Sequence, residues 1–213
     1  LDISNPKSLT QVGRYDTAGY ARGIYLQGNY AYVADGSNGL VILDISNPKS
    51  LTQVGRYDTA VNAWGVYIQG NYAYGVYVQG NYAYVADGSN GLVILDVSNP
   101  KSLTQVGRYS THYAYGVYVQ GNYAYVADGE NGLVILDISN PKSLTQVGRY
   151  STHYAYGVYV QGSYAYVADY DNGLVIIDIN AFSQSQTSLQ SPTGKVDVGP
   201  ARKIKVNGNY AYV

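Results

Sequence analysis

Residues 116–150 read GVYVQGNYAYVADGENGLVILDISNPKSLTQVGRY, and this stretch decides the fold of the chain. Four runs have strand-forming composition, at 116–120, 123–128, 133–139 and 144–150. Turn residues separate them: Gly121-Asn122, then GENG at 129–132, then NPKS at 140–143. The third run is almost continuously apolar, as in a strand covered on both faces. No segment has a helical period, so the stretch predicts a four-stranded antiparallel meander.

The same stretch recurs along the chain. The phrase LD[IV]SNPKSLTQVGRY begins at Leu1, Leu43, Leu95 and Leu136, with a degraded copy from Ile177, a period of about 42 residues with one longer step. The link at 151–155 has no hairpin signal, so we expect it to cross from the outer strand of one sheet to the inner strand of the next. Four-stranded units at this period predict an all-β fold, a β-propeller of antiparallel blades.

The strand order predicts how many blades the chain contains. With GVYVQ innermost and LTQVGRY outermost, blades span 21–57, 62–109, 113–150 and 154–199 within a single domain, 1–213. The last inner pair, 201–213, lacks outer strands, and residues 1–4 and 9–15 would supply them. This two-plus-two closure gives five blades. The run at 65–74 is nearly repeated at 75–84. An extra hairpin, a deletion from a six-bladed parent and an error in the determined sequence all explain this duplication.

The repeat also resembles a known family. The run GLVILDISNP, preceded by NYAYVADG, is similar to the LVIVD-repeat propellers of bacterial and archaeal surface proteins. The resemblance covers four copies well and the fifth in part. It implies a cell-surface or extracellular location and no defined activity.

Composition narrows the classes of function. The net charge of −1 and the 13% of charged residues do not favour a nucleic-acid partner. No apolar run is long enough for membrane insertion. The absence of cysteine excludes disulfides and thiolate metal sites. The absence of methionine and the incomplete first and last repeats indicate a processed protein, a trimmed chain or one piece of a larger protein.

Differences between the near-identical copies point to a candidate ligand site. The residue before the inner-strand glycine varies from copy to copy, and we expect this position to lie at the mouth of the central channel. The candidates are Arg22, Trp64, Tyr115, Tyr156 and Arg202, with His112 and His153 nearby. Aromatic rings beside carboxylates suit sugars, and arginine with aromatics suits peptides. The alternative interpretation is that these aromatic side chains only pack between blades.

Metal binding and catalysis find little support in the sequence. The turn motif DGxNG or its variants place Asp35, Asp87, Asp128 and Asp169 as weak calcium candidates, but a turn needs the same residues and would carry them solvated. We therefore expect no cofactor. No nucleophile motif is present. The aspartates inside the apolar strand are Asp44, Asp96, Asp137 and Asp178. Because the same carboxylate recurs in every copy, we predict that it bonds neighbouring backbone groups and that the protein is not an enzyme.

These observations predict a non-catalytic binding or adhesion module at the cell surface or outside the cell, with a protein or glycan partner. The alternative is a structural subunit of an extracellular assembly or filament that self-associates by stacking. A glycan-active enzyme is less favoured, because it would need two differentiated carboxylates across a cleft.

Overall fold

A computed structural model describes residues 11–21, 23–58, 76–180, 194–196, 204–207 and 210–212. The first sheet contains β1 (Gly23–Gln27), β2 (Tyr30–Ala34), β3 (Leu40–Asp44) and β4 (Thr52–Tyr57). The second contains β5 (Val76–Gln79), β6 (Tyr82–Ala86), β7 (Leu92–Asp96) and β8 (Thr104–Tyr109). The third contains β9 (Gly116–Gln120), β10 (Tyr123–Ala127), β11 (Leu133–Asp137) and β12 (Thr145–Tyr150). The fourth contains β13 (Gly157–Gln161), β14 (Tyr164–Asp169), β15 (Gly173–Asp178) and β16 (Gly194–Val196). A separate pair contains β17 (Lys205–Asn207) and β18 (Tyr210–Tyr212).

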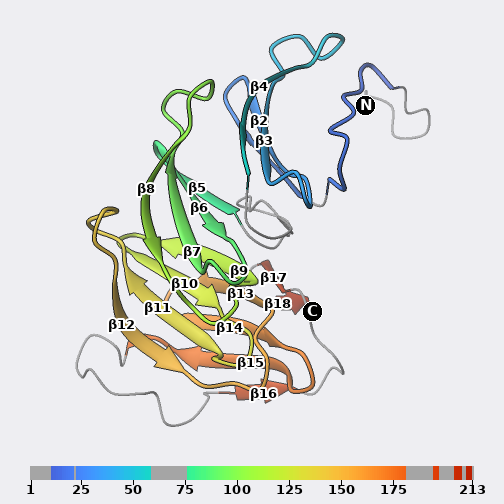
Figure 1. Cartoon of the computed structure of the whole chain (residues 1–213). Coiled ribbons are helices and arrows are strands. Elements are labelled where there is room, and N and C mark those ends of the chain that lie inside the picture. Colours follow the sequence, from blue (N-terminus) through green and yellow to red (C-terminus); the bar gives the residue numbers. More distant parts are fainter. Residues whose placement is uncertain are drawn as a thin grey trace.

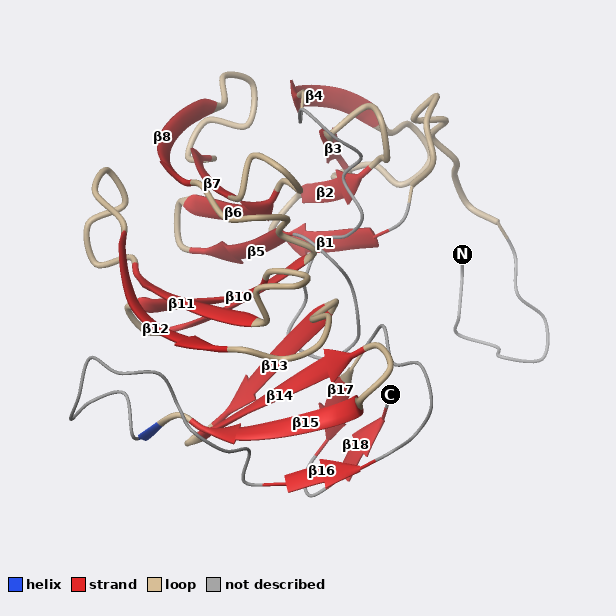
Figure 2. Cartoon of the chain, turned by 60° about the horizontal axis from the view of Figure 1, so that its bottom comes forward, coloured by secondary structure: helices blue, strands red, loops and turns tan. Residues whose placement is uncertain are grey.

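Each four-stranded sheet is an antiparallel meander in sequence order, as predicted. Figure 1 shows the sheets following one another along the chain, and Figure 2 shows them arranged around a middle that their first strands face. The all-β fold of propeller type is therefore confirmed. Among the described residues, no helix is long and apolar enough to span a bilayer.

The first strands of neighbouring blades are joined by a recurring hydrogen bond. The side-chain amide Nε2 donates from Gln27 to Gly80 O at 3.4 Å, from Gln79 to Gly121 O at 3.4 Å and from Gln120 to Gly162 O at 3.2 Å. The acceptors are the glycines of the Gly-Asn or Gly-Ser turns. The second copy of the duplicated run therefore supplies the inner strand β5, while residues 59–75 lie outside the described part.

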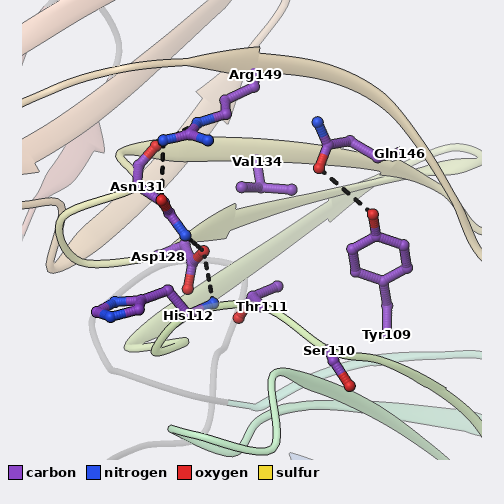
Figure 3. A pocket seen from close by; sticks show the side chains of 9 residues that line it. All are labelled: Tyr109, Ser110, Thr111, His112, Asp128, Asn131, Val134, Gln146 and Arg149. Atoms are coloured by element: carbon purple, nitrogen blue, oxygen red, sulfur yellow. Dashed lines mark hydrogen bonds between the residues drawn. The ribbon is translucent and has the colours of Figure 1, made fainter.

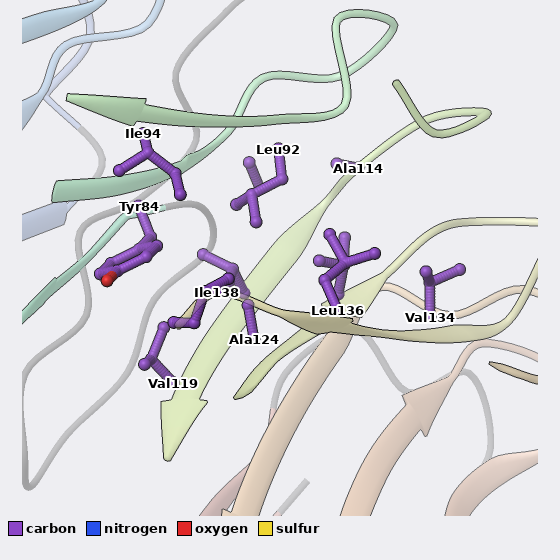
Figure 4. Packing of buried hydrophobic residues seen from close by; sticks show 12 residues of the cluster. Tyr84, Leu92, Ile94, Ala114, Val119, Ala124, Val134, Leu136 and Ile138 are labelled. Carbon is purple, nitrogen blue, oxygen red and sulfur yellow. The ribbon is translucent and has the colours of Figure 1, made fainter. Parts of the chain in front are cut away.

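The apolar core lies between blades rather than inside one blade. Alternate side chains of a strand point to opposite faces of its sheet, so each sheet packs against both neighbours. Figure 4 shows Leu92 and Ile94 of β7 facing Leu136 of β11 and Ile138 just beyond it. Leu92, Ile94 and Leu136 are 0% exposed. This packing explains why the LVILD run is apolar at almost every position.

A β-bulge lies in the outer strand pair of the first three blades. In the second blade, the register between β7 and β8 shifts between Ile94 and Leu95. The bulge lies beside Gly107, where an added Cβ would be 1.8 Å from the carbonyl oxygen of Pro141 in the next blade. Gly55 approaches Pro100 O in the same way. Contact with the neighbouring blade therefore requires glycine at positions 55 and 107 of the TQVGRY copies.

The aspartates of the LVILD run bond the backbone, as predicted. Asp96 Oδ1 accepts from the backbone N–H of Ser98 at 2.9 Å, and Asp137 Oδ1 accepts from Ser139 at 2.8 Å. The equivalent bonds join Asp44 to Ser46 and Asp178 to Asn180. The hydrogen bonds from Ser139 lower the pKa of Asp137. These carboxylates fix the start of the NPKS turn or its equivalent.

The segment before the first blade occupies the place of an outer strand. An added Cβ on Gly13 would lie 1.7 Å from Pro48 O, matching the Gly55 contact one blade later. Tyr15 Oη donates to Gln53 Oε1 at 3.5 Å, as Tyr57 Oη does to Gln105 Oε1 at 2.7 Å. Residues 11–15 nevertheless form no strand.

Apolar side chains on the inner half of the same face are exposed. Ile24 is 49% exposed and Leu26 is 53% exposed, whereas the equivalent Val117 and Val119 are 3% and 1% exposed. The pair β17–β18 forms its own sheet among the described residues. Residues 1–4 lie outside the described part, so closure of a five-bladed ring by the two termini stays a prediction.

Burial of core tyrosines predicts a loss of stability in alkali. Desolvation, followed by the nearby Tyr82 and Tyr77, raises the pKa of Tyr84 from 10.0 to about 12. Its contribution to stability is therefore complete below pH 10 and is lost as the pH rises towards 12, because only the unfolded chain ionises there. We expect Tyr84→Phe to reduce the difference in unfolding free energy between about pH 9 and about pH 11.5 in urea titrations. Tyr123→Phe, at a side chain 44% exposed, is the control. A pH dependence identical in both variants would contradict the prediction.

Candidate functional site at the crossover face

The crossover between the second and third blades, residues 110–115, is held by both of them. Ala114 pairs with Gly88 in the turn between β6 and β7, through N–H···O bonds of 3.0 and 2.9 Å. On the other side, Asp128 Oδ2 accepts from the backbone N–H of His112 at 3.0 Å, and its Oδ1 accepts from Tyr113 at 2.6 Å. The crossover therefore lies in a fixed position on the face formed by the DGxNG turns.

The next crossover repeats this arrangement. Ala155 pairs with Gly129, and Asp169 accepts from the backbone N–H groups of His153 and Tyr154 at 3.1 and 2.6 Å. Each aspartate also accepts from its own turn, where Asn131 Nδ2 donates to Asp128 Oδ2 at 2.9 Å.

The calcium candidates are thus buried structural groups rather than solvated turn residues. Their exposed fractions are Asp35 0%, Asp87 2%, Asp128 1% and Asp169 0%. The expectation of solvated carboxylates was wrong. Backbone N–H groups from the preceding crossover cover Asp128 and Asp169, and Asp35 accepts hydrogen bonds from the side chains of Thr17 and Asn38. Within the described ranges, no group of three or more His, Asp or Glu side chains gathers at one place.

Five tyrosines form a continuous cluster over two crossovers. We call Tyr113, Tyr115, Tyr154, Tyr156 and Tyr170 the tyrosine cluster. Ring centroids are 4.7 Å apart between Tyr115 and Tyr156, 4.8 Å between Tyr113 and Tyr115, and 5.1 Å between Tyr154 and Tyr156. The hydroxyls of Tyr115 and Tyr154 are 2.8 Å apart. All five side chains are partly exposed, so the cluster is a surface and not a core.

The phenol of Tyr115 is held in its neutral form. Desolvation, followed by its hydrogen bond to Tyr154, raises the pKa of Tyr115 strongly. The cluster offers aromatic rings with polar tips, which stack on flat ligands and bond to their polar edges.

Sequence reasoning missed Tyr170, the fifth member of the cluster. It stands where the first three blades have Gly36, Gly88 and Gly129, whose φ angles are +55°, +50° and +53°. Tyr170 has a φ of +21°, a region that bulky residues rarely adopt. Its ring lies 5.6 Å from that of Tyr156. The signal was available in the sequence as the one copy in which DG becomes DY.

The other predicted site residues divide into two groups. Tyr115 and Tyr156 are brought together in the cluster, and His112 and His153 lie exposed at its border. His153 Nδ1 is 3.5 Å from Asp171 Oδ2. Arg22, Trp64 and Arg202 lie outside the described residues.

A cavity of about 200 Å³ lies between the second and third blades, beside the crossover at 110–115. Figure 3 shows Val134 in its middle, with Arg149 and Asn131 on one side and Tyr109 and Gln146 on the other. Thr111 and His112 reach it from the crossover. The cavity and the tyrosine cluster therefore share one segment of chain.

The fold and this repeated face define a repeat protein of the β-propeller type. The LVIVD repeat family model matches residues 1–17, 18–59, 75–111, 112–152, 153–191 and 198–213. The chain belongs to the LVIVD repeat family. The family match leaves out residues 60–74, in agreement with β5 being formed by the second copy of the duplicated run. No curated protein matches the chain.

Solved structures of designed proteins share the fold. The computationally designed Ika8 protein is 7% identical, with a TM-score of 0.60 over 88% of this chain and 53% of that chain. This chain thus spans about half the length of Ika8. The designed Ika4 protein is also 7% identical, with a TM-score of 0.59 over 81% of this chain and 99% of that chain. At this identity the likeness concerns the fold alone.

Proposed function

We propose that the protein is a non-catalytic binding module, located at the cell surface or outside the cell, that recognises a protein or glycan partner through the tyrosine cluster. The location rests on the resemblance to surface proteins. The observation that carries the binding role is Tyr170, a bulky residue at a position where the other described blades have glycine.

Backbone strain at Tyr170 supports a role in binding rather than in folding. A residue in a rarely populated φ region costs roughly 1–3 kcal/mol. Glycine serves this turn in three blades, so the turn itself does not need a tyrosine. What the tyrosine adds is a ring within contact distance of Tyr156 at the edge of the cluster. Strain that extends an aromatic surface is typical of a recognition site.

The pre-ordered crossovers also support this role. Both carry the cluster, and both are fixed by buried carboxylates and by paired glycines. A partner that lands on these rings would not need to order the loops, which lowers the entropic cost of binding.

The test replaces Tyr170 with glycine, the residue of the other blades. We expect Tyr170→Gly to leave the free energy of unfolding within about 1 kcal/mol of the original, because relieved strain offsets the lost ring contact. We expect binding of any ligand found on glycan and peptide arrays to weaken by about tenfold or more.

Tyr123→Ala is the matched control for this test. Its side chain is exposed and follows the Gly121-Asn122 turn, away from the cluster. A ligand whose affinity falls equally in both variants, or in neither, would overturn the proposal.

A structural role in an extracellular assembly is the second candidate. The observation in its favour is on β1, where Ile24 and Leu26 expose apolar side chains that the equivalent described strands bury. The partner would be an inner hairpin of a second copy, which carries the matching repeat sequence. Light scattering tests this role: a concentration-dependent increase in mass that Leu26→Lys abolishes would support it, and a constant monomer mass would exclude it.

A further inference from the structure

The repeat copies on either side of the cavity between the second and third blades lack a carboxylate that the two earliest copies have. Arg14 and Arg56 each form an ion pair with the aspartate two positions on, Asp16 and Asp58. The copies that end in Arg108 and Arg149 have Ser110 and Ser151 at those positions. No carboxylate pairs with Arg149 in the part of the chain that the structure describes.

Two hydrogen bonds fix the orientation of the Arg149 side chain and leave some of its N–H donors unused. Its Nε donates to Asn131 O at 3.0 Å and its Nη2 donates to Asn131 Oδ1 at 2.9 Å. A guanidinium has five N–H donors in a fixed plane, so further donors remain. The side chain is partly buried, where a charge-assisted hydrogen bond is stronger than in open water.

The cavity also contains one further unused donor. Thr111 Oγ1 is buried and has no hydrogen-bond partner among the described residues, whereas the equivalent Thr17 Oγ1 donates to Asp35. The one carboxylate that lines the cavity, Asp128, is buried and already accepts three hydrogen bonds. Glu130 is exposed at the tip of the same turn and does not line the cavity.

We propose that this cavity binds a carboxylate of a partner protein, an aspartate or glutamate side chain, on Arg149. The chain itself shows the pairing two repeats earlier, where the Asp58 carboxylate meets Arg56. A protein partner is favoured over a glycan because the internal partner of Arg56 is an aspartate side chain. Tyrosine and arginine are also enriched at the hot spots of protein–protein interfaces. The inference deepens the proposed function by naming the chemistry of its partner.

The experiment follows NMR shifts of the Thr111 and His112 amides and of Arg149 Nε–H on addition of sodium acetate at constant ionic strength. Saturable shifts that sodium chloride does not produce are the expected result. Arg149→Gln and Ser151→Asp should each weaken the association by about fivefold or more, because the first removes the cation and the second neutralises it from within the chain. Shifts that persist in Arg149→Gln, or that chloride reproduces, would overturn the proposal.

Three further comparisons make the result specific. Ser143→Asp adds the same charge in the NPKS turn and should leave acetate binding unchanged; an equal loss would mean that only net charge matters and would overturn the proposal. N-acetyl-aspartyl amide should bind more tightly than glucuronate, and the reverse order would overturn the assignment to a protein partner. Tyr170→Gly should leave the acetate shifts unchanged, so failure of the tyrosine site and failure of this subsite can be told apart.

Discussion

Replacing Gly107 with alanine is expected to destabilise the protein by about 3 kcal/mol or more. The new Cβ would lie 1.8 Å from the carbonyl oxygen of Pro141 and 3.0 Å from its carbonyl carbon. Both partners of this clash are fixed to backbone, so no side-chain rotation relieves it. The NPKS turn of the third blade would have to move away from β8, and apolar contacts between the two blades would open. Urea unfolding followed by circular dichroism measures the loss.

Gly121→Ala is the matched control for this variant. Gly121 has a φ of +60° and nothing within 4 Å of an added Cβ. Its alanine variant should therefore lose only about 1–2 kcal/mol, the cost of the left-handed backbone. If Gly107→Ala is no less stable than Gly121→Ala, the close approach of neighbouring blades at this glycine is wrong.

Replacing Asp128 with alanine is expected to cost roughly 3 kcal/mol or more. The carboxylate is 1% exposed and accepts from the backbone N–H groups of His112 and Tyr113 and from the Asn131 side chain. Removing it leaves several buried donors without an acceptor at once. The crossover should loosen as well, so the amides of His112 and Tyr113 should exchange with solvent much faster.

Asp137→Ala provides the comparison, because it removes a carboxylate from the same blade that accepts from the backbone N–H of Ser139 at a half-buried position. We expect a loss of about 1 kcal/mol there. Asp128→Asn, which keeps one acceptor oxygen, should be intermediate. Equal losses in Asp128→Ala and Asp137→Ala would show that burial of the Asp128 carboxylate adds nothing to the free energy of unfolding.

Most of the fold follows from local patterns in the repeat. The Gly-Asn turn predicts a hairpin, and Gly121 indeed has a positive φ. The LVILD run predicts a strand covered on both faces, and Leu133 to Leu136 are buried. Asp137 is predicted to bond nearby backbone, and it does so two residues along the chain. These features depend on neighbours close in sequence, which a single copy of the repeat contains.

Features that depend on the next blade were not predictable in the same way. The role of Gly107 rests on Pro141, and Asp128 is covered by backbone groups that come from His112 and Tyr113. A DG pair looks like a solvated turn until the preceding crossover is placed over it. The variable positions Tyr115 and Tyr156 were identified because they differ between copies, and Tyr170 differs by the same criterion but falls in a turn that we had interpreted as structural.

The doubly held crossover has a consequence for how such a chain can grow. Each repeat contributes an aspartate that accepts hydrogen bonds from the crossover before it. The same repeat contributes the glycine turn that pairs with the crossover after it. A genetic copying event that inserts one whole period therefore brings both halves of the new joint with it. No second mutation is needed to fit the added unit to its neighbours, which explains how nearly identical copies can accumulate in one gene and still fold.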